Sequence, residues 1–413
     1  MAITDSDSFL AFRQLNFRRF IFSKFMLTLA LQIQFVVLSW QVYEITHDPL
    51  SLGLLGLAEA IPAVGLALYG GYVSDRSDRR TILVRVIALQ LIVSIALLCT
   101  SWYYTHDHAL TKATPFYIIM FLVGILRSFY SPAQFPLMTQ VVPREAYANS
   151  SAWNSTFWHI GVVAGSAGGG IMLSMIGKNN SYIVVLVLIL LSIIQMWRIP
   201  KQPIQGSIKT ETMNESIREG LRFVFKNQPV FGALTLDLVA VLFGGAVAML
   251  PVFASDVLHV GETGFGLLRA APFAGSVIMA LYMTKHPPLK NAGRKLLFCV
   301  AAFSVCMIAF ALSHSFYLSM FILALSGAFD NVSVVIRSTI LQYLCPEDMR
   351  GRVSSVSTMF ISSSNELGAF ESGFAAKLIG LIPSVIFGGV VAVTSVGAAA
   401  KWLPELRRLD LKN

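Results

Sequence analysis

Five ionisable residues lie inside long apolar stretches of the sequence, where charged side chains are rare: Glu59, Arg127, Asp237, Arg269 and Asp330. An apolar environment makes a carboxylate hold its proton more tightly, and a nearby arginine makes it release that proton more readily. A carboxylate that gains and loses an arginine partner can therefore carry a proton across a barrier. We predict proton coupling by these five residues, with Glu59 as the first candidate for the carrier and Asp330 as the second.

Other charged residues leave alternatives open. Arg337 is a further arginine that could pair with one of the carboxylates. Glu366 and Glu371 are further acids, although packing near Lys377 could fix both of them instead. For four of these residues, Glu59, Arg127, Arg269 and Asp330, the alternative is a set of structural ion pairs that hold helices in register.

A second group of polar and aromatic side chains could contact a small bound molecule. Each lies in an apolar stretch, where a hydrogen-bonding group or an indole ring can face a cavity. The candidates for a substrate cavity are Gln34, Gln41, Trp153, Asn154, Trp158, His159 and Glu366. An intramembrane histidine titrates near neutral pH, but a hydrogen-bonded packing role is the alternative for His159.

Motifs for metal binding or covalent catalysis are missing from the sequence. The four cysteines show no CxxC or CxxH spacing, so neither a metal site nor a disulfide framework is predicted. The sequence contains no HExxH and no GxSxG motif. We therefore expect no cofactor, no metal and no enzymatic activity.

The composition points to lipid as the solvent of this chain. Of the 413 residues, 55% are hydrophobic and 13% are charged, whereas a soluble domain has about 25% charged residues. A membrane-spanning helix needs about 20 mostly apolar residues. Twelve such stretches are predicted, at residues 20–45, 50–74, 81–104, 114–135, 150–176, 181–198, 229–255, 263–284, 294–313, 316–342, 354–381 and 383–402.

Lysine and arginine predict the orientation of these spans. Most of them fall in the segments on the same side as the N-terminus, and only Lys112, Lys178 and Lys377 fall on the opposite side. Because basic residues favour cytoplasmic loops, both termini are predicted to be cytoplasmic in a plasma (inner) membrane. The net charge of +9 therefore indicates contact with a lipid surface, and no nucleic-acid partner is expected.

The chain is predicted to form two six-helix halves, residues 1–198 and 229–413, joined by a cytoplasmic linker at 199–228. Within the linker, Ile217, Leu221 and Val224 recur at helical spacing among charged residues. This pattern predicts an amphipathic helix on the membrane surface, with a plain charged connection as the alternative.

The two halves can be aligned with each other. Residues 56–62 match residues 266–272, so that Glu59 corresponds to Arg269, and Arg127 corresponds to Asp330. The charge is reversed at both pairs of positions. Parallel repeats of this kind are typical of secondary transporters whose substrate site lies between the halves.

A glycine and several charges follow the second span. Gly71, Asp75, Arg76, Arg79 and Arg80 have the spacing for a close helix approach followed by a carboxylate that can meet a helix N-terminus. We predict that these residues form a conformational latch. Asp78 stands between them.

This loop resembles the Gly-x-x-x-Asp-Arg-x-Gly-Arg-Arg loop of the major facilitator superfamily, with Asp78 where the family prefers glycine. The glycine-rich stretch 161–170 is similar to a motif in the fifth helix of the superfamily's antiporters, with Ser166 in place of the usual proline. Small residues allow close helix packing, and this stretch is expected to seal one half against the other. Arg127 matches a membrane-embedded arginine implicated in proton coupling in many family exporters.

Residues 267–272, 346–353 and 365–373 are similar to the drug:proton antiporter branch that includes enterobactin and macrolide exporters. The resemblance covers nearly the whole chain. It implies an all-α membrane protein with two halves related by a pseudo-two-fold axis. It also implies a monomer that binds a small molecule and protons. The expected function is proton-coupled export of an amphipathic small molecule, such as a siderophore or drug.

Three alternatives remain open at this point. The same helices could serve an importer or a lysophospholipid flippase. A membrane receptor would carry an appended soluble domain or a long loop, and a membrane enzyme would carry a catalytic motif.

Overall fold

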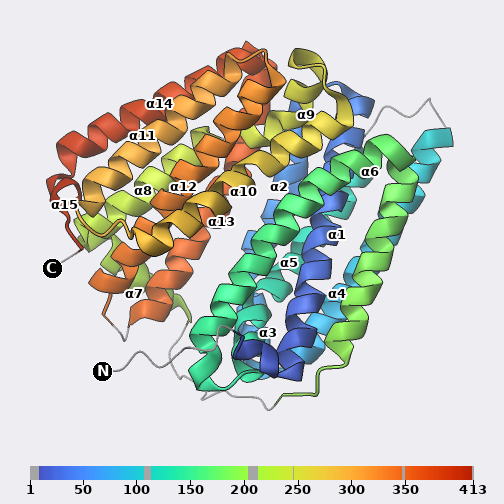
Figure 1. Ribbon diagram of the computed structural model, residues 1–413, viewed down its shortest axis with the longest axis horizontal. Helices are drawn as coiled ribbons and strands as arrows, with labels where there is room; N and C mark the ends of the chain where they lie inside the picture. Colours follow the sequence, from blue (N-terminus) through green and yellow to red (C-terminus); the bar gives the residue numbers. More distant parts are fainter. Residues whose placement is uncertain (1–8, 107–112, 203–212, 245, 347–348, 412–413) are drawn as a thin grey trace. The chain divides into compact units, whose positions relative to one another are not determined.

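The computed structural model describes residues 9–106, 113–202, 213–244, 246–346 and 349–411. Within these ranges the regular structure is helical throughout, without a strand (Figure 1). Contacts divide the chain into two compact units, residues 1–46 with 58–207 and residues 47–57 with 208–413. Each unit is described by itself below.

The N-terminal unit is built on one central packing interface, between α1 and α6. Its helices are α1 (Leu15–Thr46), the end of α2 (Pro49–Gly65), α3 (Ala67–Arg76), α4 (Arg79–His106), α5 (Thr114–Gln140) and α6 (Tyr147–Trp197). α1 lies along α6 in Figure 1. Ser23 and Ser192 exchange hydrogen bonds across this interface while fully buried. The two helices are therefore joined by polar as well as apolar contacts.

The glycine-rich stretch explains how closely α6 approaches α1. A side chain at Gly161, Gly165 or Gly169 would press against α1, at Thr28, Gln32 and Ile33 respectively. Close packing at these glycines is therefore present. The expected partner was the other half of the chain, but these contacts are made with α1 of the same unit.

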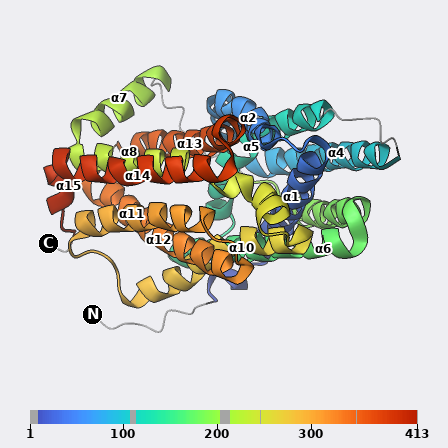
Figure 2. The same cartoon turned by 90° about the horizontal axis from the view of Figure 1, so that it is seen from above.

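The C-terminal unit contains α7 (Met213–Lys226), α8 (Gln228–Phe243), α9 (Leu250–Val252), α10 (Gly261–Lys285), α11 (Ala292–Ala311), α12 (Phe316–Leu344), α13 (Arg350–Ile379), α14 (Leu381–Trp402) and α15 (Pro404–Arg408). A short 3₁₀ turn and a π-helix (Phe253–Val257) extend α9 at its two ends. Figure 2 shows α14 running beside α8 and α11.

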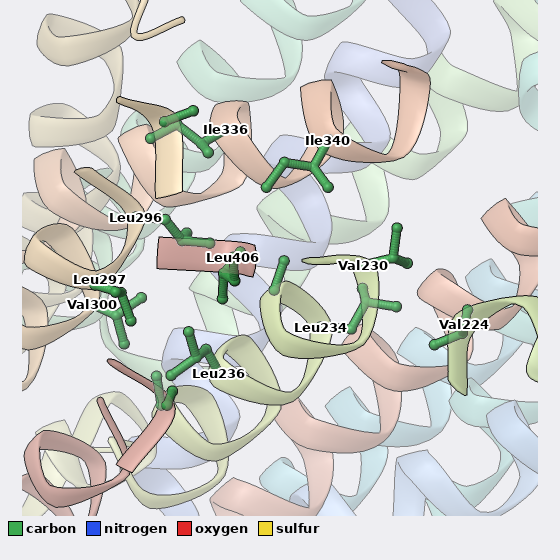
Figure 3. Close-up of a cluster of buried hydrophobic side chains, with 14 of the residues drawn as sticks. Val224, Val230, Leu234, Leu236, Leu296, Leu297, Val300, Ile336, Ile340 and Leu406 are labelled. Carbon is green, nitrogen blue, oxygen red and sulfur yellow. The ribbon is translucent and has the colours of Figure 1, made fainter. Parts of the chain in front are cut away.

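A hydrophobic cluster holds the C-terminal unit together (Figure 3). It joins buried side chains of α8, α11 and α12, including Leu234, Leu296 and Ile340, to Leu406 of α15. Val224 of α7 is also fully buried in it. The predicted amphipathic stretch is thus helical, and its apolar face at Val224 and Leu221 packs on this cluster.

The predicted spans agree with the helices, with some differences at the ends. Nine described helices are long and apolar enough to cross a membrane. α6 counts as two crossings, because Gly177 at φ 76° breaks it between the predicted spans 150–176 and 181–198. With α13 and the α2–α3 pair added, the described helices fit twelve crossings. The turn predicted at Ile382 and Pro383 lies instead at Gly380. This glycine has a φ of 90° and directly precedes the first residue of α14.

The start of α2 packs in the C-terminal unit. Gly53 approaches the backbone of Phe370 in α13, and the Lys377 ammonium pairs with Asp48 at 2.7 Å. Lys377 was expected to pack near Glu366 and Glu371. Its ion-pair partner is instead Asp48, in the loop before α2. The division into six-helix halves remains a prediction.

The sequence repeat has a counterpart in the packing of each unit. In the N-terminal unit, Gly124 of α5 lies against the backbone of Glu59 and the ring of Pro62 in α2. In the C-terminal unit, Gly327 of α12 lies against the backbone of Pro272 in α10. These positions match in the sequence alignment of the halves. In each unit, a glycine at the equivalent position thus lets two helices pack closely beside charged residues.

Candidate functional site

Glu59 and Arg127 form an ion pair within the N-terminal unit. Arg127 lies one helical turn after Gly124, so the close approach of α2 and α5 brings the two side chains together. Arg127 Nη1 donates to Glu59 Oε1 at 2.8 Å. The side chains are 44% and 15% exposed. The ion pair thus joins two of the residues predicted for proton coupling, and the side chain of Arg127 stays partly exposed.

Asp237 and Arg337 form the most buried ion pair among the described residues. They come from α8 and α12, and their side chains are 7% and 5% exposed. Removing both charges from solvent is costly unless they stay paired. Asp237 was a predicted proton site, and the arginine that it pairs with is Arg337, which the sequence named only as a further arginine.

Asp330 lies close to this pair. It precedes Arg337 by two helical turns of α12, so both project from one side of that helix, and it lies within electrostatic range of both Asp237 and Arg337. Asp237, Asp330, Cys299 and Ser333 line one cavity of about 10 Å³, which is space for about one water. Two carboxylates thus face one guanidinium.

The fifth predicted charge, Arg269, is half-buried in α10, three residues before the closely packed Pro272.

Gln34 and Gln41 are buried in helix interfaces of the N-terminal unit. Gln34 accepts a hydrogen bond from Ser94 at 2.6 Å. Gln41 donates to Ser101 at 3.0 Å and accepts from Tyr182 at 3.3 Å. Their amides hold α1 to α4 and α6, which indicates packing rather than the substrate contact expected from sequence.

The predicted residues of α6 separate into two groups. Trp153 packs in an aromatic cluster with Phe9, Phe12 and Phe157. His159 Nδ1 lies 2.8 Å from the Ser155 carbonyl of its own helix, and the ring of Trp158 meets His159 edge-on. Asn154, by contrast, lines a cavity. The side chain of Glu366 lies outside the described residues.

The predicted latch is anchored to the end of α6. Arg80 donates to the carbonyls of Ile199 and Trp197. Asp78, which replaces the glycine of the resembling motif, accepts from the Thr81 amide at 3.3 Å and from Gln202 at 3.3 Å. It therefore caps α4, since an aspartate at this position satisfies a free N–H of the first turn.

The other latch residues differ in their surroundings. Arg76 lies over the ring of Tyr72, 4.3 Å from its centre, and Arg79 is half-buried. The helix approach expected at Gly71 is found at Gly70, which lies against the Ser128 backbone of α5. The side chain of Asp75 lies outside the described residues.

Lys24 is a residue that the sequence analysis missed. The structure places it inside α1, where its ammonium donates to Asn154 at 2.8 Å. Its position within the predicted span 20–45 was the available signal.

Comparison with known proteins defines the class. Residues 6–413 match the family described as transmembrane secretion effector. The chain is 25% identical over 406 residues to the multidrug efflux pump Tap of Mycolicibacterium fortuitum, covering 92% of this chain and 93% of Tap. It is 23% identical over 397 residues to the enterobactin exporter EntS of Escherichia coli O1:K1, covering 95% and 92%.

The fold is shared with a solved D-xylose-proton symporter at a TM-score of 0.73, with 15% identity, 96% of this chain and 100% of that chain covered. The protein is a multi-pass membrane transporter of the major facilitator superfamily. Within it, the chain belongs to the transmembrane secretion effector family.

Proposed function

We propose that this transporter exports an amphipathic small molecule in exchange for protons, by alternating access. Export is supported by the relatives named as a multidrug efflux pump and an enterobactin exporter. Proton exchange is supported by one observation above all, the position of Asp330 beside the buried Asp237–Arg337 pair. Two carboxylates near one guanidinium leave a net negative charge, which a bound proton can neutralise.

Asp330 is our candidate for the proton carrier. The guanidinium of Arg337 is paired with Asp237. An ionised Asp330, which is half-buried beside this pair, therefore adds a second negative charge that no further arginine or lysine among the described residues pairs with. A proton on Asp330 removes that charge. A change in access that draws Arg337 toward Asp330 would then release the proton.

Glu59 remains the second candidate. Its carboxylate already has Arg127 as a partner at 2.8 Å, so its negative charge is offset by one positive charge. This reverses the preference from sequence, because the charge balance that distinguishes the two carboxylates depends on which arginine each one meets in three dimensions.

We also propose a location and a domain arrangement for this transporter. We place the protein in the plasma membrane with both termini in the cytoplasm, as a monomer whose halves 1–198 and 229–413 rock about the linker 199–228. This arrangement rests on the charge distribution of the loops and on the family's parallel repeats.

Untargeted mass spectrometry of medium and cells tests export. A strain overexpressing the protein is compared with one expressing Asp330→Asn. A compound enriched in the medium only with the intact protein identifies a substrate and supports export. Enrichment inside the cells would instead show uptake.

Reconstituted protein tests proton coupling. Transport of the identified compound into liposomes is measured with and without an imposed pH gradient, for the intact protein, Asp330→Asn and Glu59→Gln. We expect Asp330→Asn to lose the stimulation by the gradient and Glu59→Gln to keep at least part of it. The opposite result would make Glu59 the carrier, and an intact protein indifferent to the gradient would refute proton coupling.

A further inference from the structure

A second cavity lies in the N-terminal unit, between α1, α5 and α6. Its volume is about 180 Å³, and its walls combine the apolar side chains of Phe20, Phe135 and Met138 with polar ones. The polar groups come from all three helices: Lys24 of α1, Ser131 and Gln134 of α5, and Asn154 of α6. The pocket thus has one cationic group among apolar and hydrogen-bonding neighbours.

Lys24 differs in its partner from two lysines that form ion pairs. Lys178 and Lys377 each pair with a carboxylate at 2.7 Å, Glu44 and Asp48 respectively. The Lys24 ammonium instead bonds to the neutral amide of Asn154 at 2.8 Å, and no carboxylate among the described residues pairs with it. An ammonium without a counter-ion is costly within a membrane span.

We infer that this pocket is a subsite for the acidic group of the transported molecule, such as a carboxylate or sulfonate next to a ring. Lys24 supplies the charge, Ser131 and Gln134 supply hydrogen bonds, and Phe20 and Met138 contact the apolar part. The inference rests on the proposed function, because it takes the ligand to be the transported molecule.

The size of the pocket fits part of a ligand. Complete small-molecule sites measure about 300–1,000 Å³, so 180 Å³ holds one acidic group with its ring. The rest of the molecule extends beyond the pocket. A charge-assisted hydrogen bond is roughly twice as strong as a neutral one, which makes the subsite selective for anions.

Three dansyl compounds that differ in charge test this inference. Binding of dansylglycine (anionic), dansylamide (neutral) and dansylcadaverine (cationic) is measured by fluorescence polarisation with the full-length protein in nanodiscs. We expect dansylglycine to bind at least about tenfold more tightly than dansylamide, which is about 1.4 kcal/mol. Undetectable binding of dansylglycine at millimolar concentration, or no preference over dansylamide, would overturn the inference.

Variants assign the preference to Lys24. Lys24→Met should abolish the tenfold difference between dansylglycine and dansylamide, and Lys24→Arg should keep it. Asn154→Asp places a carboxylate beside the ammonium and should also abolish the preference. Lys178→Gln, which removes a paired lysine elsewhere in the unit, is the matched control and should leave it unchanged.

A preference for the anion that survives Lys24→Met would refute the subsite. This failure is distinguishable from failure of the proposed function, because proton-driven export of the compound found by mass spectrometry is measured separately. Export of a cationic compound together with equal binding of the three probes would overturn the subsite and leave the transporter assignment intact.

Discussion

The Asp237–Arg337 pair gives a prediction about single residues and stability. Asp237→Ala leaves a buried guanidinium without its partner, and this should lower the free energy of unfolding by about 3–5 kcal/mol. The double variant Asp237→Ala/Arg337→Met removes both charges and should recover most of the loss. Thermal unfolding in detergent measures both variants; equal stability of the single variant and the intact protein would contradict the prediction.

Glu59 and Arg127 provide the contrasting case. Their pair is partly exposed, with Arg127 at 44%, and such pairs contribute about 0–1 kcal/mol. Arg127→Gln should therefore change the thermal midpoint much less than Asp237→Ala does. A loss as large as that of Asp237→Ala would show that the N-terminal pair is buried in the membrane protein.

The sequence predicted the charged residues of the site, but not how they pair. Charges in apolar stretches identify Glu59, Asp237 and Asp330, because such charges must face the protein interior. The pairing of Asp237 with Arg337 depends on how closely α8 approaches α12. That approach is set by packing between residues that are far apart in the sequence. For the same reason the sequence predicts Gln34 as a substrate residue, although its side chain is buried and its amide oxygen accepts a hydrogen bond from Ser94.

At the scale of helices, close contact at glycine gives the next prediction. A side chain at Gly124 would collide with the backbone of Glu59, and one at Gly327 with the backbone of Pro272. Gly124→Ala and Gly327→Ala should each cost about 1–3 kcal/mol through overpacking. Gly168→Ala is the matched control, because its side chain would meet nothing within 4 Å, and it should be neutral. Equal melting temperatures for all three variants would argue against these contacts.

The cap of α4 gives a second prediction at this scale. Asp78→Ala removes the acceptor for the Thr81 amide and should cost about 1 kcal/mol, whereas Asp78→Asn keeps an acceptor and should cost less. Thermal unfolding compares the two variants. Identical losses would show that the carboxylate acts through its charge or through Gln202 instead of as a cap.

Most of the helices could be predicted from the sequence, because a span needs only a long apolar block and its ends carry polar or turn residues. The break at Gly177 fell between two predicted spans for this reason. The turn at Gly380 was missed because proline at 383 suggested a boundary, while the actual turn depends on a positive φ that glycine adopts readily. The break that separates α2 from α3 also could not be predicted from the hydropathy of the sequence.

At the scale of the whole molecule, the orientation in the membrane gives the last prediction. The turn at Asn180 is proposed to face outward and the loop at Lys290 to face the cytoplasm, and both side chains are exposed. Single cysteines are introduced at these positions after Cys99, Cys299, Cys306 and Cys345 are replaced by serine, since Cys99 is itself exposed. In intact cells, a membrane-impermeant maleimide should label Asn180→Cys, and it should label Lys290→Cys only after permeabilisation. The reverse pattern would place both termini outside, and the direction assigned to proton flow and export would then have to be reversed as well.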